Sequence, residues 1–225
     1  QGWYAVAVES LQRALDLRPD ADGVRLSLAQ DLMTLGRYSD ALEHLTYLRD
    51  RQPDNPAVAF TLARCLAWKG QKDRAVKLLD RLLDDEPDNW TALSERGWLC
   101  VDLDRPGEAE AYLRRAQALA PPDQALLTRL SDCLRLLGKH DEARRYREEA
   151  DRLRADTLRA LDLGKRIRAK PNDPDLCSDL ARVLLRLGKE QDALHFFQKA
   201  LEKNPHHRPT HESLAAFYAK VGAFR

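Results

Sequence analysis

The sequence has almost no net charge, since 37 lysines and arginines stand against 36 aspartates and glutamates for a formal charge of +1. Binding to the phosphate backbone of nucleic acids needs an excess of basic residues, so we do not expect a nucleic acid as the partner. No run approaches the roughly 18 apolar residues that a membrane-spanning helix requires. Aromatic residues make up only 7% of the 225 residues, and charged residues make up 32%. These features favour a helical chain with a large surface and no single large core.

The four cysteines, Cys65, Cys100, Cys133 and Cys177, form no CxxC pair. A zinc site usually contains at least one such close pair, and disulfide frameworks are typical of short secreted chains. We therefore predict four free, buried thiols, with no metal site and no cofactor. This cysteine pattern is compatible with the cytoplasm.

Catalytic signatures are also missing. The sequence contains no GxSxG, P-loop, GxGxxG, HExxH or CxxCH motif, so it does not indicate an enzyme. Of the histidines, only His206, His207 and His211 cluster. Pro209 lies within this cluster, where a loop is expected to lead into a helix, and we predict surface histidines there rather than metal ligands.

What the sequence does contain is a period of 34 residues. Proline, alanine, glycine and a further column of small residues recur at fixed positions of this period. These residues are Pro19, Pro53, Pro87 and Pro121; Ala7, Ala41, Ala75, Ala109 and Ala143; Gly36, Gly70 and Gly138; and Ala29, Ala63, Gly97 and Ser131. A constant period of this length indicates an array of structural repeats, so the length of the chain counts repeats rather than globular cores.

Each repeat is predicted to form two helices. In residues 56–89, apolar residues recur at the helical spacing both before and after Gly70. Gly70 supplies the positive φ that ends the first helix, and Pro87 stops the second. The small side chains of Ala63 and Ala75 let the two helices approach closely. Neither helix can bury its apolar face alone, so neighbouring repeats must stack.

The period, the helix pairs and the residue columns together resemble the tetratricopeptide repeat (TPR) family. The residues that carry the resemblance are Leu28-Ala29, Gly36, Tyr38, Ala41-Leu42 and Pro53 in one repeat, and Leu180-Ala181, Gly188, Ala193-Leu194, Phe197, Ala200-Leu201 and Pro205 in another. Arg96, Asp104 and Ala155 depart from the columns. The resemblance implies an all-α solenoid of stacked antiparallel helix pairs that winds into a right-handed superhelix.

The period is interrupted once, by 16 additional residues between Ala150 and Pro171. Residues 141–170 contain no proline and a single glycine, which favours one helix of about 30 residues, roughly 45 Å long. Two helices with a kink near Asp156 are the alternative. The segment carries ten basic and seven acidic residues, a composition typical of a solvated, ion-paired helix face.

These boundaries predict the organisation of the chain. Residues 1–155 form a TPR array, with a half repeat at 1–21 and repeats at 22–55, 56–89, 90–123 and 124–155. Residues 156–173 form a helical extension, and residues 174–225 form one further repeat and a C-terminal half repeat. Half repeats at both ends suggest a piece of a longer protein, and their exposed faces favour self-association.

One stripe on the first helix of each repeat points away from the core columns and is predicted to face a concave groove. The stripe consists of Leu26, Gln30, Met33 and Thr34; Phe60, Arg64, Ala67 and Trp68; Ser94, Trp98, Val101 and Asp102; Thr128, Asp132, Arg135 and Leu136; and Ser178, Arg182, Leu185 and Arg186. Tryptophan and arginine are frequent interface anchors. From the stripe and its flank we predict a partner-binding groove formed by Gln30, Phe60, Arg64, Trp68, Trp98, Asp102, Arg129, Asp132 and Arg135. For Trp68 and Trp98, an ordinary core position is the alternative.

The predicted function is that of a non-catalytic scaffold that binds a peptide or a partner protein in this groove. The peptide would be extended or helical, with an apolar side chain and an acidic group. One alternative is a regulatory or substrate-recruiting region of a larger enzyme or assembly. A second alternative is a self-assembling scaffold.

Overall fold

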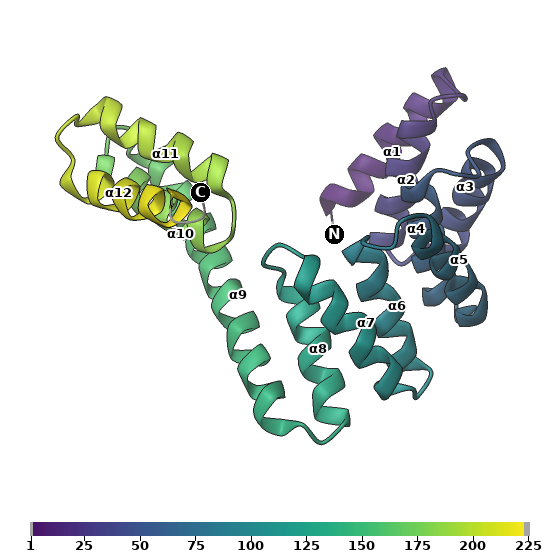
Figure 1. The fold of residues 1–225 in the computed structure, drawn as a ribbon. Helices are drawn as coiled ribbons and strands as arrows, with labels where there is room; N and C mark the ends of the chain where they lie inside the picture. The colour runs from purple at the N-terminus through teal and green to yellow at the C-terminus, as the bar shows by residue number, and fades with distance from the viewer. Residues whose placement is uncertain (1, 223–225) are drawn as a thin grey trace. The chain divides into compact units, whose positions relative to one another are not determined.

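The computed structural model describes residues 2–222, which form twelve helices and no strand (Figure 1). The helices are α1 (Gly2–Leu17), α2 (Asp22–Thr34), α3 (Tyr38–Arg51), α4 (Pro56–Trp68), α5 (Lys72–Asp85), α6 (Trp90–Asp102), α7 (Pro106–Leu119), α8 (Gln124–Leu136), α9 (His140–Ala169), α10 (Pro174–Arg186), α11 (Glu190–Lys203) and α12 (Arg208–Gly222). The predicted all-α fold of helix pairs is confirmed. Within the described residues, no helix combines the length and the apolar character needed to cross a bilayer.

Local sequence signals explain where these helices begin and end. Asn55 caps α4, because its side-chain oxygen accepts hydrogen bonds from the backbone N–H groups of Ala57 at 3.0 Å and Val58 at 3.4 Å. Pro56 takes the first helical position of α4. A backbone N–H group at that position has no acceptor within the helix, so the lack of this group in proline costs no hydrogen bond. Gly70, with a φ of +78°, then turns the chain toward α5.

Asp104 takes the place of a glycine in the turn between α6 and α7. Its φ is +57°, in the left-handed region. Aspartate and asparagine tolerate this conformation better than other residues with a side chain, although glycine adopts it without strain. The turn therefore keeps the geometry of the other repeats at some energetic cost.

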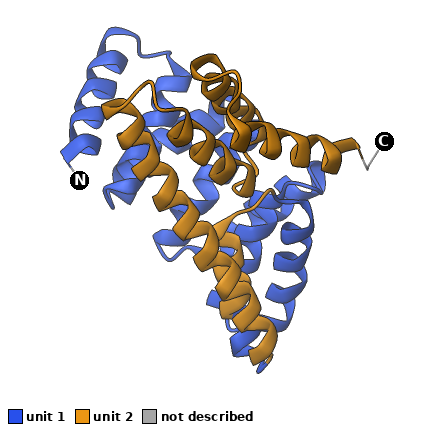
Figure 2. Ribbon diagram, turned by 90° about the vertical axis from the view of Figure 1, so that its left-hand side faces the viewer, with its two compact units in different colours: residues 1–120, 133–138 blue, residues 121–132, 139–225 orange. Residues whose placement is uncertain are grey.

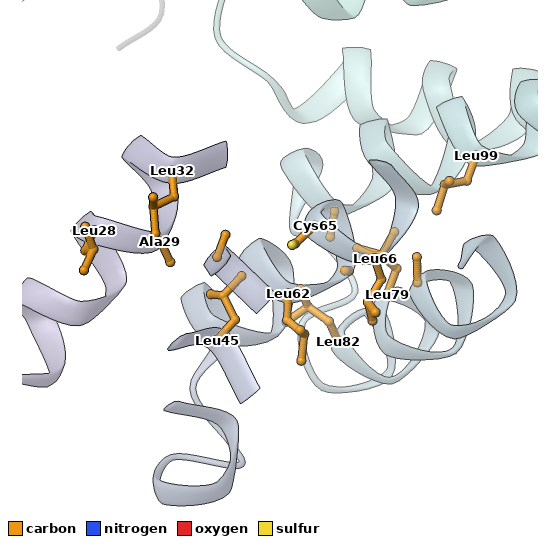
Figure 3. Packing of buried hydrophobic residues seen from close by; sticks show 14 of the residues in the cluster. Leu28, Ala29, Leu32, Leu45, Leu62, Cys65, Leu66, Leu79, Leu82 and Leu99 are labelled. Carbon is orange, nitrogen blue, oxygen red and sulfur yellow. The ribbon is translucent and has the colours of Figure 1, made fainter. Parts of the chain in front are cut away.

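The predicted columns form the core. Leu28, Ala29, Leu62 and Ala63 are at most 1% exposed, and they belong to a cluster of buried side chains from α1 to α6, part of which is drawn in Figure 3. Gly97 takes the alanine position on α6. A Cβ atom placed on Gly97 would lie 2.7 Å from Cγ of a leucine on α7, so these two helices approach too closely for any side chain.

Arg96 departs from the leucine column, and a local ion pair explains how it is accommodated. The residue is only 6% exposed. Its Nε donates a hydrogen bond of 2.6 Å to the Asp80 carboxylate, and its guanidinium lies 5.0 Å from the centre of the Tyr112 ring. A buried cation is tolerated when it is paired in this way.

All four cysteines are free and buried, as predicted. Cys65 and Cys133 occupy the same position of the period. Their sulfur atoms lie 3.3 Å from the carbonyl oxygens of Tyr38 and Pro106, the first residues of α3 and α7. Burial raises the pKa of the Cys65 thiol, so this residue acts as a small hydrophobic side chain.

Helix α9 is a single helix of 30 residues, so the prediction of one long helix is confirmed and the alternative of two helices is wrong. Ala155, which stands where the period would place a proline, continues the helix. Asp156 on the same helix accepts hydrogen bonds of 2.8 and 2.6 Å from Arg186 of α10. This ion pair lowers the pKa of the Asp156 carboxyl group.

The chain divides into two compact units (Figure 2). The first unit comprises residues 1–120 and 133–138, and the second comprises residues 121–132 and 139–225. Each unit has a hydrophobic cluster of its own, centred on α2 to α5 in the first and on α10 and α11 in the second. The domain boundaries drawn from the repeat period stay a prediction.

Candidate partner-binding groove

Helices α2, α3 and α4 of the first unit enclose a hollow of about 270 Å³. The side chains that line it come from the end of α2, the first residue of α3 and one face of α4. They are Gln30, Met33, Thr34, Tyr38, Thr61, Arg64 and Trp68. The structure therefore brings together three of the nine predicted groove residues, namely Gln30, Arg64 and Trp68. We call this site the first hollow.

Trp68 is the most prominent side chain of the first hollow. It is 64% exposed, so the alternative of a core position is wrong for this tryptophan. Its ring stacks on Tyr38, with 5.8 Å between the ring centroids and 3° between the planes. Sequence reasoning missed Tyr38 as a groove residue because it begins the second helix of its repeat. The stacking fixes the orientation of an exposed aromatic surface.

Arg64 and Phe60 lie one helical turn apart on α4. Arg64 is exposed, and its guanidinium lies 5.7 Å from the centre of the Phe60 ring. Phe60 is half-buried and packs against the core of the first unit. Thr61 is buried at the hollow, and its hydroxyl donates a hydrogen bond of 2.7 Å to the carbonyl oxygen of Ala57. The Phe60 ring thus makes a cation–π contact with Arg64.

The other predicted groove residues lie outside the first hollow. Trp98 is half-buried on α6, and Asp102 at the end of that helix forms an ion pair of 3.4 Å with Lys72. Arg135 is exposed on α8. Arg129 and Asp132 are half-buried and belong to the second unit, whereas Arg135 belongs to the first. The nine predicted residues are therefore divided between the two units.

Two stripe residues that were predicted to face the groove are buried instead. Ser94 is 5% exposed and Ser178 is 1% exposed. Both occupy the repeat position that Phe60 holds on α4. Their side chains therefore offer almost no surface to a partner.

His207 is also buried, at 6% exposure, so its prediction as a surface residue is wrong. Its Nε2 lies 3.0 Å from a carboxylate oxygen of Asp175, and its Nδ1 lies 2.8 Å from the Thr210 hydroxyl. The imidazole thereby links the start of α12 to the first turn of α10. His206 and His211 are exposed, as predicted.

Sequence profiles of the tetratricopeptide repeat match residues 32–96, 69–124 and 174–207. Together these matches cover more than half of the chain. No curated protein sequence matches it.

Solved structures of TPR proteins have a similar fold. A thermophilic TPR protein from Thermus thermophilus is 23% identical with a TM-score of 0.55, and the match covers 87% of this chain and 98% of that one. A tetratricopeptide repeat protein from Parabacteroides merdae is 20% identical with a TM-score of 0.52, and the match covers 90% of this chain and 74% of that one. YrrB, described as a TPR protein with an unusual peptide-binding site, is 17% identical with a TM-score of 0.50, and the match covers 92% of this chain and 99% of that one.

At these identities the structural matches show the fold, and the sequence profiles show the family. TPR proteins are generally non-catalytic scaffolds. This chain belongs to the tetratricopeptide repeat family, and that membership implies a role in protein–protein interaction.

Proposed function

We propose that the first unit binds a peptide, or a peptide-like segment of a partner protein, in the first hollow. The observation that carries this proposal is Trp68, which is 64% exposed and yet held by stacking on Tyr38. Tryptophan is a frequent hot spot of interfaces. A side chain that is already ordered loses little conformational entropy on binding. YrrB, which has the same fold, is described as containing a peptide-binding site, and this agrees with the proposal.

The size and chemistry of the first hollow indicate what it would accept. Sites for drug-sized molecules usually measure about 300–1,000 Å³, and this hollow measures about 270 Å³. It therefore suits one or two side chains rather than a whole small molecule. Met33 and Trp68 would contact an apolar side chain, and Arg64 would bind an acidic group beside it.

The wider groove is part of the same proposal. Trp98, Asp102 and Arg135 would extend the binding surface of the first unit, and Arg129 and Asp132 would contribute to binding by the second. The scaffold would act without catalysis of its own. The same peptide binding would allow the chain to act as a regulatory or substrate-recruiting region of a larger enzyme or assembly. Self-association of the chain stays a separate prediction.

The proposal is tested with peptides selected from a random display library against the full chain. Their dissociation constants are measured by fluorescence anisotropy for the wild type and for the double variant Trp68→Ala/Arg64→Ala. Loss of one hot-spot tryptophan and its neighbouring cation should weaken binding at least about tenfold. Circular dichroism should show unchanged helicity, because both side chains are exposed.

A matched control is Trp3→Ala/Arg74→Ala, which also removes one tryptophan and one arginine. Trp3 is 89% exposed on α1, and Arg74 is exposed on α5; neither lines the first hollow. This variant should bind as tightly as the wild type. Equal affinities for the wild type and the Trp68→Ala/Arg64→Ala variant would refute the proposed site, as would equal weakening of both double variants.

A further inference from the structure

The second unit contains a larger hollow at the same position of the repeat. Its volume is about 800 Å³, and its lining comes from α10, the turn after it, the start of α11, α12 and Pro122, all of which belong to that unit. The lining of the second hollow corresponds to that of the first by position in the repeat. On α10, the equivalents of Gln30, Met33 and Thr34 of α2 are Arg182, Leu185 and Arg186. On α12, the equivalents of Arg64 and Trp68 of α4 are Ala216 and Lys220. We call this site the second hollow.

The chemistry of the second hollow differs from that of the first. Glu190 and Lys220 replace the stacked pair of Tyr38 and Trp68. Two arginines replace a glutamine and a threonine. The lining therefore contains three cations and one acid, beside apolar side chains such as Leu185 and Phe217. This combination is complementary to a ligand that is both apolar and acidic.

Ion pairs hold two of these cations in place. Arg186 donates from Nε and Nη2 to the two carboxylate oxygens of Asp156, at 2.8 and 2.6 Å. Arg182 pairs with Asp179. The guanidinium groups keep further N–H donors for a ligand, since each carries five. Asp156, Asp179 and the lining residue Glu190 together balance the three cations, so the second hollow suits a single acidic group, bound through the remaining N–H donors and Lys220, rather than a polyanion.

We propose that the second hollow is a separate peptide site that accepts a bulky apolar side chain next to an aspartate or glutamate. This inference rests on the proposed function, because the site repeats the position of the first hollow. An 800 Å³ hollow can take several side chains of one segment. Two such sites, with different linings, let one chain hold two partner segments at once.

The test uses the full chain carrying Trp68→Ala/Arg64→Ala, so that the first hollow does not contribute. Three pools of fluorescein-labelled peptides share a central Phe or Leu, which is flanked by Asp/Glu, by Asn/Gln or by Lys/Arg. The acidic pool should bind at least about tenfold more tightly than the neutral pool. Its affinity should fall as the salt concentration rises, because exposed charges are screened.

Two further substitutions, each made on that background, locate the site. Lys220→Glu reverses a charge of the lining, and Ala216→Trp fills the hollow; both positions are exposed, so the fold should persist. Each should weaken binding of the acidic pool at least about tenfold, and Lys220→Glu should improve binding of the basic pool. Lys165→Glu, at an exposed position of α9, is the matched control and should change nothing.

Equal binding of the three pools would overturn the second site. Unchanged binding of the acidic pool to both the Lys220→Glu and the Ala216→Trp proteins would also overturn it. If the acidic pool binds the wild type but not the Trp68→Ala/Arg64→Ala background, the peptides use only the first hollow, and the second site is again excluded. Failure of the proposed function is recognised separately: peptides that were selected on the wild type and are insensitive to Lys220→Glu and Ala216→Trp would then also be insensitive to Trp68→Ala/Arg64→Ala.

Discussion

Gly97 stands in a column that holds alanine in the two preceding repeats. Gly97→Ala should lower the free energy of unfolding by about 1–3 kcal/mol, the usual effect of overpacking, because the new Cβ would lie 2.7 Å from Cγ of Leu113. Gly107→Ala is the matched control, since a Cβ at that exposed position of α7 meets no atom within 4 Å. Urea unfolding should show the control unchanged or slightly more stable. Equal stability of the two variants would contradict the close approach of α6 and α7.

Asp104 offers the opposite test, because its φ of +57° suits glycine better than aspartate. Asp104→Gly should raise the free energy of unfolding by up to about 1 kcal/mol. Asp104→Ala should lower it, since alanine has a Cβ and lacks the polar side chain that helps aspartate adopt this conformation. Thermal unfolding of the two variants measures the difference. A destabilised glycine variant would show that the Asp104 side chain makes a stabilising contact.

The imidazole of His44 predicts a dependence of stability on pH. Burial lowers its pKa from the ordinary value, and the positive charge of Arg25 lowers it further; the two groups lie 3.3 Å apart. Between the lowered pKa and about 6.5, the unfolded chain binds more protons than the folded chain. The contribution of His44 to the free energy of unfolding should therefore be fully present above about pH 6.5 and should be lost as the pH drops through that window.

His44→Gln removes this titrating group and should reduce the slope of stability against pH below about 6.5. Urea unfolding at a series of pH values compares the variant with the wild type. The other histidines are present in both proteins, so their contribution cancels in the difference. Identical slopes would show that His44 titrates alike in the folded and unfolded chains.

The burial of single residues was the hardest property to predict from the sequence. The period assigned Trp68 and His207 to positions in a repeat but did not give their depth. Trp68 is ordered by Tyr38, and His207 is held by Asp175; both partners belong to other helices. Such contacts depend on how helices stack, which no local pattern encodes.

At the scale of elements, α9 allows a test of the backbone alone. Ala155 lies near the middle of this helix and is exposed. Ala155→Pro should cost about 3 kcal/mol or more, because proline removes a helical hydrogen bond and clashes with the preceding turn. Ala155→Gly should cost only about 1 kcal/mol. Hydrogen exchange of the α9 amides measures both effects, and unchanged protection in the proline variant would contradict one continuous helix.

The helices themselves were predictable because proline and glycine mark their ends in the sequence. The segment 141–170, which lacks proline, forms α9 from His140 to Ala169. Asp104 and Arg96 depart from the repeat columns, yet the helices around them form normally. Asp104 adopts the left-handed conformation that the turn requires, and the ion pair with Asp80 allows Arg96 to be buried. The sequence alone does not reveal these compensations, since Asp80 is in the preceding repeat.

For the whole molecule, the sequence predicted the face that carries the first hollow but not its full composition. Gln30, Arg64 and Trp68 were predicted, and they line one site. Tyr38 lines the same site but begins α3, the second helix of its repeat, so it lies outside the stripe on the first helices. In the second hollow, Arg182 and Arg186 lay on the predicted stripe, whereas the contribution of Lys220 became apparent only from the structure.

Met33 allows a direct measurement of the central claim, that a peptide binds in the first hollow. It is the single methionine of the sequence, and it lines this hollow. Protein labelled with ¹³C at the methionine methyl group should therefore give one methyl signal in the NMR spectrum. A peptide selected against the full chain should shift that signal in the wild type and should leave it in place in Trp68→Ala/Arg64→Ala. A Met33 signal that does not move at saturating peptide would contradict binding at the first hollow.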